Sequence, residues 1–378
     1  MNKNDKMLMI ESYISQLMES SDAQNPAWNI EKVLSGELNK WNYIDGCMIT
    51  AILSLYETTG ERRYLDFADN FVGWYVQEDG SIKTYDIEEY NLDNINPGKN
   101  LFKLYAFTQK QKYRKAMDTV RLQLDTMPRT KSGNFWHKKI YPYQIWLDGL
   151  YMAQPFYMQY ETEFNKMQGC RDSFVQFENV YKLMRRDDGL YCHGYDESRE
   201  MYWANKHTGQ SSNCWLRAMG WYVTGLVDTI EVMDEQLYYE YRTLRKILKE
   251  AIDALLPWQN EDGMFYQIVD KPWEDGNYLE TSGTALIAYA VLKAVRLGLL
   301  SERYKTFAKN AFYGTVKRYL SQDENGDLRL SGICLVAGLG GTQHRDGSLE
   351  YYFSEPVVEN EAKGVAPLLL AYTEILKG

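Results

Sequence analysis

Six segments of the chain begin at a small residue and continue as nearly uninterrupted runs of apolar side chains. They start at Gly46, Pro97, Gly149, Gly220, Gly283 and Gly364. Helices that are apolar on nearly all faces are buried helices. Between them lie segments with one apolar stripe, typical of surface helices, at 7–20, 62–76, 113–127, 170–186, 241–255 and 304–312. This alternation predicts an all-α fold, an (α/α)6 six-hairpin toroid in which six outer helices surround six inner ones.

The lengths of the connections predict where a functional site lies. Connections from inner to outer helices are short, whereas the reverse connections are long, at 77–96, 128–148, 187–218, 258–281 and 322–362. Long ordered connections in a compact domain are usually functional. Because each one leads to the start of an inner helix, we expect all of them at one rim. No linker or strand-rich segment divides the chain, which predicts a single domain over 1–378.

The composition of the chain limits the kinds of molecule that it can bind and the compartment in which we expect it. A net charge of -10 and a sequence pI near 5.1 argue against nucleic acid. The five cysteines lack C-x-x-C spacing, which indicates free thiols in a reducing compartment. We find no signal-peptide pattern and no apolar run of membrane-spanning length. We therefore expect a cytoplasmic protein that binds neither nucleic acid nor a membrane; the sequence does not indicate an oligomeric state.

Charged and aromatic residues gather just before the inner helices. Helix N-termini that meet at one rim favour a bound anion, because each carries partial positive charge and unpaired N–H groups. The residues at these positions are Asp45, Asp93, Asp148, Arg217, Glu280 and Glu361, accompanied by Trp41, Tyr43, Trp146 and Trp215. Any single carboxylate among them could be a helix cap. The set as a whole is better explained by a binding site.

Asp148 has the most informative surroundings. It ends the segment 141–148 (YPYQIWLD), which places a carboxylate able to transfer a proton beside aromatic rings able to stack on a sugar. All four histidines lie in the long connections, at His137, His193, His207 and His344. No HExxH motif, Cys/His cluster, phosphate loop or G-x-S-x-G elbow is present. The sequence therefore favours side-chain acid–base chemistry on a carbohydrate, with no metal and no cofactor.

Several motifs resemble those of the unsaturated rhamnogalacturonyl hydrolases, glycoside hydrolase family 105. The most specific are 133–138 (GNFWHK), 146–152 (WLDGLYM) and 215–221 (WLRAMGW), and the resemblance extends over nearly the whole chain. It implies the same six-hairpin toroid. It also implies removal of 4,5-unsaturated galacturonate from the non-reducing end of lyase-generated rhamnogalacturonan or pectin oligosaccharides. The partner would then be a small anionic oligosaccharide.

The resemblance also implies roles for individual residues. Asp148 would be the general acid/base that protonates C4 of the vinyl ether and then helps water attack C5, so one carboxylate suffices where ordinary glycosidases use two. Asp93 would be a second catalytic aspartate, whose negative charge raises the pKa of Asp148 and keeps it protonated. The implied substrate-binding residues are Trp41, Tyr43, Asp45, His137, Lys138, Trp146, His193, Trp215, Arg217 and Trp221.

Three alternatives stay open at this point. The chain could belong to the sister family that hydrolyses unsaturated glucuronides derived from glycosaminoglycans or other polysaccharides. It could be a toroid that binds carbohydrate without catalysis. It could also be an ordinary inverting glycosidase, which would cleave saturated substrates. The sequence indicates neither the leaving sugar, nor the accepted chain length, nor the role of the 338–362 loop.

Overall fold

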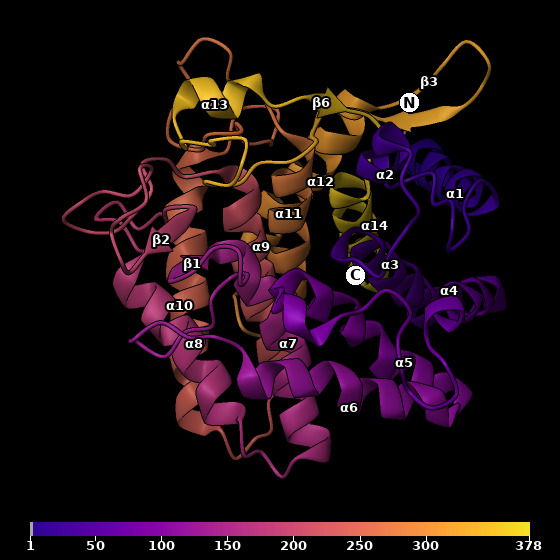
Figure 1. The fold of residues 1–378 in the computed structure, drawn as a ribbon. Helices are drawn as coiled ribbons and strands as arrows, with labels where there is room; N and C mark the ends of the chain where they lie inside the picture. Colours follow the sequence, from indigo (N-terminus) through magenta and orange to yellow (C-terminus); the bar gives the residue numbers. More distant parts are fainter. Residues whose placement is uncertain (1–2) are drawn as a thin grey trace.

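The computed structural model describes residues 3–378, and these residues form the predicted toroid (Figure 1). The inner helices are α3 (Tyr43–Thr59), α5 (Lys99–Thr108), α7 (Leu147–Phe164), α9 (Leu216–Glu231), α11 (Thr281–Arg296) and α14 (Ala362–Lys377). The outer helices are α1 (Lys3–Glu19), α4 (Arg62–Tyr75), α6 (Gln111–Thr126), α8 (Cys170–Leu183), α10 (Tyr238–Leu255) and α12 (Tyr304–Tyr319). Inner and outer helices alternate along the chain, as predicted. The shorter helical segments are α2 (Ile30–Ser35), η1 (Ile87–Glu89), η2 (Leu92–Gly98), η3 (Leu256–Trp258) and α13 (Leu349–Ser354).

The inner helices close into a ring. α3 packs against η2 and α5, η2 packs against α7, and the ring continues through α9, α11 and α14 back to α3. In α11 every residue from Thr281 to Val295 is buried, as an apolar run predicts. The glycine that opens this run permits close packing, because a Cβ on Gly283 would lie 2.4 Å from Cγ of Leu216. Gly283 and Gly220, whose Cβ would lie 2.8 Å from Cβ of Leu286, therefore mark the point where the inner helices α9 and α11 touch.

The outer helices bury a single face each. In α10 the buried side chains are Leu244, Ile247, Leu248, Ala251, Ile252 and Leu255, which recur at helical spacing.

The five cysteines are free and buried, so the prediction of free thiols is confirmed. Within residues 3–378, no helix is both long and apolar enough to cross a membrane.

The outer helices α4, α6, α8, α10 and α12 are followed by the same tight turn, which ends in a glycine. After α6, Gly133 N donates to Thr130 O at 3.0 Å and Thr130 N donates to Asn134 O at 2.8 Å. The glycine has a φ of 98°, a conformation that residues with a side chain rarely adopt. The turn at Gly326 joins two short strands, β3 (Leu320–Gln322) and β4 (Leu328–Leu330), whereas single bridges close three others.

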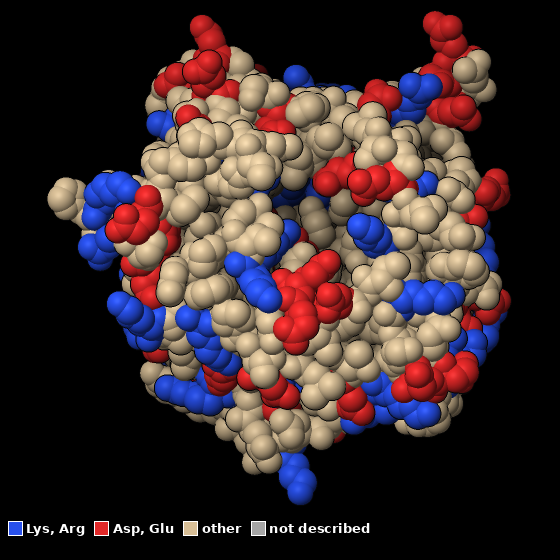
Figure 2. All heavy atoms as spheres, in the orientation of Figure 1, with Lys and Arg blue, Asp and Glu red and all other residues tan. Residues whose placement is uncertain are grey.

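The long connections meet at one rim, as predicted. β1 (Gln144–Trp146) leads into α7 and pairs antiparallel with β2 (Gly194–Asp196) from the next connection. β5 (Ile333–Cys334) pairs with β6 (Val357–Val358), which folds the last connection back on itself. In the orientation of Figure 1 the molecule is hollowed near the middle of the visible face (Figure 2). Acidic and basic side chains lie next to each other at the edge of this hollow.

Candidate active site

Asp148 lies in the first turn of α7. The N-cap position of this helix is Trp146, and no side chain caps it. The Asp148 side chain is 13% exposed, and its buried Oδ2 faces His193. A negative charge is favoured at a helix N-terminus. Asp148 is therefore not a helix cap, and its carboxylate keeps a small exposed surface at the rim.

His193 is the neighbour that controls this carboxylate. Its Nε2 lies 3.2 Å from Asp148 Oδ2, and its Nδ1 shares a hydrogen bond of 2.8 Å with Tyr352 Oη. Tyr352 comes from α13 and fixes the orientation of the fully buried ring. Burial raises the pKa of Asp148, but His193 and, more weakly, His137 outweigh this effect, and the pKa lies below its usual value.

The expected raised pKa of Asp148 is therefore wrong. The expectation treated Asp93 as a bare negative charge, but Lys138 Nζ lies 2.6 Å from Asp93 Oδ2 and balances that charge. The nearer influence on Asp148 is His193, which favours the ionised form. In the free protein near neutral pH, Asp148 is a carboxylate.

Asp93 forms the centre of a second group of polar side chains. It lies in η2, and the backbone there is joined to the 128–148 connection by a 3.1 Å bond from Leu92 N to His137 O. His137 Nε2 lies 3.8 Å from Asp93 Oδ1. Burial lowers the pKa of His137 to about 4, so its imidazole is neutral at pH 7. Gly149 leaves room for this ring, since a Cβ there would lie 3.1 Å from His137 Nδ1.

Aromatic rings pack around these groups. Trp146 stacks on His137 with ring centroids 4.5 Å apart and on Tyr141 at 4.8 Å. The edge of Trp146 meets His193 at 5.5 Å, and Trp215 lies 4.8 Å from the same histidine. Trp146 and Trp215 are both buried. The polar groups are therefore held among closely packed aromatic rings.

Arg217 lies in the first turn of α9, the helix next to α7 in the ring. Its guanidinium is buried and donates to Ser282 Oγ at 3.2 Å, to Cys334 O, and to Leu335 O at 3.3 Å. It also lies 4.7 Å from the ring of Trp215. The three bonds hold the arginine in place, so its orientation is set before any ligand binds.

Tyr43 connects the Asp93 side of the rim to the Arg217 side. Burial raises the pKa of Tyr43 well above its usual value; the carboxylates of Glu31 and Asp93 add to this effect, and Arg217 opposes it. Tyr43 therefore lies within the electrostatic reach of both groups. The structure brings together Asp148, His193, Asp93, His137, Lys138, Tyr43, Trp146, Trp215 and Arg217.

Asp45 and Trp41 have structural partners. Asp45 Oδ1 accepts a bond of 2.9 Å from Trp28 Nε1, and Oδ2 accepts bonds of 2.7 and 2.8 Å from Asn39 and Asn42. Both oxygens are engaged, so Asp45 fastens the 21–42 segment to α3 and offers no free carboxylate. Trp41 is buried and donates from Nε1 to the Asn94 carbonyl at 2.9 Å. Its ring supports η2, the element that carries Asp93.

Trp221 lies deeper than the other predicted residues. It follows Arg217 by four positions, which places it one turn further down the same face of α9. It stacks on Tyr151 of α7 with centroids 4.5 Å apart. The other two histidines, His207 and His344, are exposed and lie outside the group around Asp148.

Two acidic residues before inner helices are helix caps. Glu280 accepts from Ser282 N at 3.0 Å and from Gly283 N at 2.7 Å at the start of α11. Glu361 caps α14 by accepting from Lys363 N at 3.4 Å. For Glu361 the capping interpretation is confirmed, and the structure gives Glu280 the same role.

Sequence reasoning missed the side chains that support the site from far along the chain. Tyr352, which orients His193, is one of 31 tyrosines and stands in no recognisable motif. Arg345 Nη2 donates to Tyr141 Oη at 2.8 Å and ties the last connection to the aromatic wall. Among the side chains that the structure describes, no three His, Cys, Asp or Glu residues are grouped as metal ligands.

Several known proteins are similar to this chain in sequence and in architecture. A glycoside hydrolase of family 105 from C. acetobutylicum ATCC 824 superposes with a TM-score of 0.89 and 42% identity, over 97% of this chain and 98% of that chain. A protein from Agrobacterium fabrum is 40% identical over 232 residues, which cover 60% of this chain and 98% of the relative. The unsaturated rhamnogalacturonyl hydrolase YesR of Bacillus subtilis is 24% identical over 264 residues, 68% of this chain and 72% of YesR. The resemblance to family 105 is thus confirmed, and because the family model of Glycosyl Hydrolase Family 88 matches residues 13–378, the chain belongs to that family of glycoside hydrolases.

Proposed function

We propose that the protein removes 4,5-unsaturated galacturonate from the non-reducing end of lyase-generated rhamnogalacturonan or pectin oligosaccharides. The observation that carries this proposal is the partly exposed Asp148 carboxylate, whose Oδ2 lies 3.2 Å from His193 Nε2 at a rim rich in aromatic rings. Family membership supports glycoside hydrolysis as the reaction class. The preference for galacturonate is supported by the three sequence motifs and by the similarity to YesR.

In this proposal the reaction is hydration of the C4=C5 double bond. Asp148 donates a proton to C4, the positive charge that develops at C5 is met by a water molecule, and Asp148 takes the proton that this water loses. The product is a hemiketal at C5, whose ring opens to a ketone and releases the sugar attached at C1. Because no group displaces the leaving sugar at C1, one carboxylate can serve as both acid and base.

Asp148 becomes protonated when the substrate binds. The free protein holds this residue ionised through His193. A bound uronate adds a negative charge and excludes water, and both changes raise the pKa of a neighbouring carboxyl group. In the same proposal Lys138 and Arg217 bind the substrate carboxylate, and Trp146 stacks on the sugar ring.

We expect His193→Asn to move the alkaline limb of the kcat/KM profile to higher pH. The reaction needs protonated Asp148, so the rate falls as pH rises through its pKa; removing His193 removes the group that lowers this pKa. Initial rates over a pH series measure the limb, because kcat/KM reports ionisations of the free enzyme. His207→Asn, at an exposed histidine, is the matched control and should leave the limb in place. An unchanged limb in His193→Asn would contradict the assignment.

A panel of disaccharides tests the substrate. We expect unsaturated galacturonyl-rhamnose to lose its ultraviolet absorbance with a kcat/KM at least about tenfold above that of unsaturated glucuronides. The lyase removes the C4 hydroxyl that distinguishes the two uronates, so the substrates differ in the linkage at C1 and in the leaving sugar. A tenfold preference corresponds to about 1.4 kcal/mol, which a few mismatched contacts to the leaving sugar can supply. Faster loss with the glucuronides would assign the sister activity. Cleavage of saturated disaccharides would indicate an ordinary glycosidase. Binding with intact absorbance would indicate a toroid without catalysis.

A further inference from the structure

A second cavity opens on the axis of the toroid, at the end opposite Asp148. Its volume is about 360 Å³, within the range of small-molecule pockets, about 300–1,000 Å³. On α7, Pro155 and Gln159 line this cavity about two to three helical turns beyond Asp148. All six inner helices contribute to the wall, through Thr50, Lys99, Pro155, Asp228, Tyr289 and Glu374.

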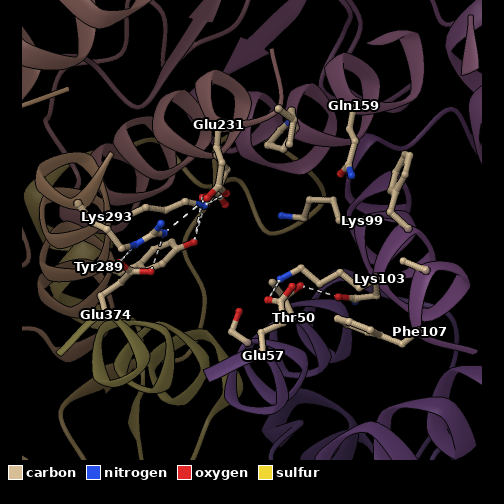
Figure 3. A pocket seen from close by; sticks show the side chains of 18 of the residues that line it. Thr50, Glu57, Lys99, Lys103, Phe107, Gln159, Glu231, Tyr289, Lys293 and Glu374 are labelled. Carbon is tan, nitrogen blue, oxygen red and sulfur yellow. Dashed lines mark hydrogen bonds and ion pairs between the residues drawn. The ribbon is translucent and has the colours of Figure 1, made fainter. Parts of the chain in front are cut away.

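Most charged side chains around this cavity are paired with each other (Figure 3). Lys293 Nζ lies 2.6 Å from both Asp228 and Glu231. Arg296 Nε lies 2.6 Å from Glu374. Lys377 Nζ lies 3.0 Å from Glu374 as well. Three cations therefore face three carboxylates, and these groups leave no unmet charge for a ligand.

Lys99 differs from these cations. Its Nζ is buried, has no hydrogen-bond partner and points into the cavity (Figure 3). It lies 3.5 Å from the centroid of the Tyr151 ring, which also stacks with Trp221. Two groups this close to one ring must occupy its opposite faces, so Tyr151 separates Lys99 from Trp221. An ammonium carries three N–H donors, and leaving buried donors without acceptors is costly.

The charge on Lys99 is also poorly compensated. Burial lowers its pKa to about 8; Asp228 and Cys47 oppose this shift, whereas Lys293 and Lys103 reinforce it. At pH 7 most molecules therefore carry a positive charge on Lys99. An anion bound beside Nζ would favour this protonated form.

We propose that this cavity binds a small molecule with a single carboxylate group, whose oxygens accept hydrogen bonds from Lys99 Nζ. Phe102 and Phe107 supply apolar wall for the carbon skeleton. Glu57 and Glu231 also line the cavity, and each is already paired with a lysine. A ligand with two negative charges would therefore have one charge matched by Lys99 and the other unmatched. The site thus favours a monocarboxylate over phosphate. This binding is independent of the hydrolytic reaction proposed above.

Titration of the full chain with propanoate, followed by saturation-transfer NMR of the ligand, tests the proposal. We expect propanoate to bind at least about tenfold more tightly than propanamide, its neutral isostere, because a hydrogen bond to a charged group is worth about 1.5–3 kcal/mol. Lys99→Met should weaken propanoate binding by a similar factor. Lys103→Met combined with Glu57→Gln is the matched control, because these two residues line the same cavity as an ion pair of 2.5 Å and their joint replacement leaves no unpaired charge. The affinity of this control variant for propanoate should be nearly unchanged.

Equal affinity for propanoate and propanamide, or unchanged affinity in Lys99→Met, would overturn the proposal. Tighter binding of inorganic phosphate than of propanoate would overturn the preference for a monocarboxylate. A measurement on the unmodified chain covers the case in which Lys99→Met does not fold. Its affinity for propanoate should fall as pH rises above about 8, where Lys99 loses its proton; constant affinity across that range would also overturn the proposal.

Discussion

Replacing Asp148 with asparagine is expected to reduce kcat by about 10²- to 10⁴-fold, the usual contribution of a general acid or base. The amide has nearly the same shape as the carboxylate, but it cannot give a proton to C4 or take one from water. The amide also keeps a carbonyl oxygen that can face His193 Nε2, which lies 3.2 Å from Asp148 Oδ2. We therefore expect little loss of folding stability. Loss of the ultraviolet absorbance of unsaturated galacturonyl-rhamnose measures the rate.

Two further measurements make the Asp148→Asn result specific. Calorimetry should show that the variant still binds the disaccharide, because the aromatic wall and Arg217 are intact. Asp346→Asn is the control, since this exposed aspartate lies in the last connection and accepts only from Ser348 N at 2.9 Å among backbone donors. Its rate should stay within about twofold of the unsubstituted protein, as surface substitutions generally do. Activity of Asp148→Asn within tenfold of normal would exclude this residue as the proton donor.

The architecture could be predicted because each helix is specified by residues that lie close together in the sequence. Each inner helix is marked by a small residue and an apolar run, and each outer helix by a stripe such as that of α10. The tight turns after the outer helices were also foreseeable, because Gly133 and its equivalents occupy a conformation that favours glycine. Alternation of the two helix types then leaves few arrangements that bury every apolar face.

The electrostatics of the site could be predicted only in part. Position before an inner helix correctly placed Asp148, Asp93 and Arg217 at one rim. The sign of the Asp148 pKa shift depends instead on His193, which precedes a different helix, and on the counter-ion that Lys138 provides to Asp93. These pairings are set by the tertiary structure, and no spacing in the sequence reports them.

Side-chain direction was the other property that the sequence did not determine. Asp45 lies in the first turn of α3, just as Asp148 lies in the first turn of α7. The Asp45 side chain nevertheless points toward Trp28 and the 21–42 segment. Tyr352 acts on His193 across 159 positions. A residue's place at the rim therefore predicts its neighbourhood, whereas its role follows from which donors and charges surround it.

Glu280→Ala is expected to destabilise the fold by about 4 kcal/mol or more, because each buried donor left without an acceptor costs about 1–3 kcal/mol. Glu280 is fully buried and accepts from Ser282 N, Ser282 Oγ, Gly283 N and Cys334 N at 2.6–3.2 Å. The substitution should also raise KM, because the Cys334 carbonyl helps to hold Arg217. Urea unfolding measures the stability, and initial rates measure KM.

Burial should determine how much stability Glu280→Ala loses, and an exposed helix cap provides the comparison. Asp86 caps η1 by accepting from Glu88 N at 2.9 Å, but it is exposed, so water replaces the lost acceptor when the side chain is removed. Asp86→Ala should therefore cost about 1 kcal/mol or less. Equal losses in the two variants would mean that capping alone explains Glu280. A large loss of stability with unchanged KM in Glu280→Ala would mean that Arg217 keeps its orientation without the Cys334 contact, and that this arginine is held mainly by Ser282 and Leu335.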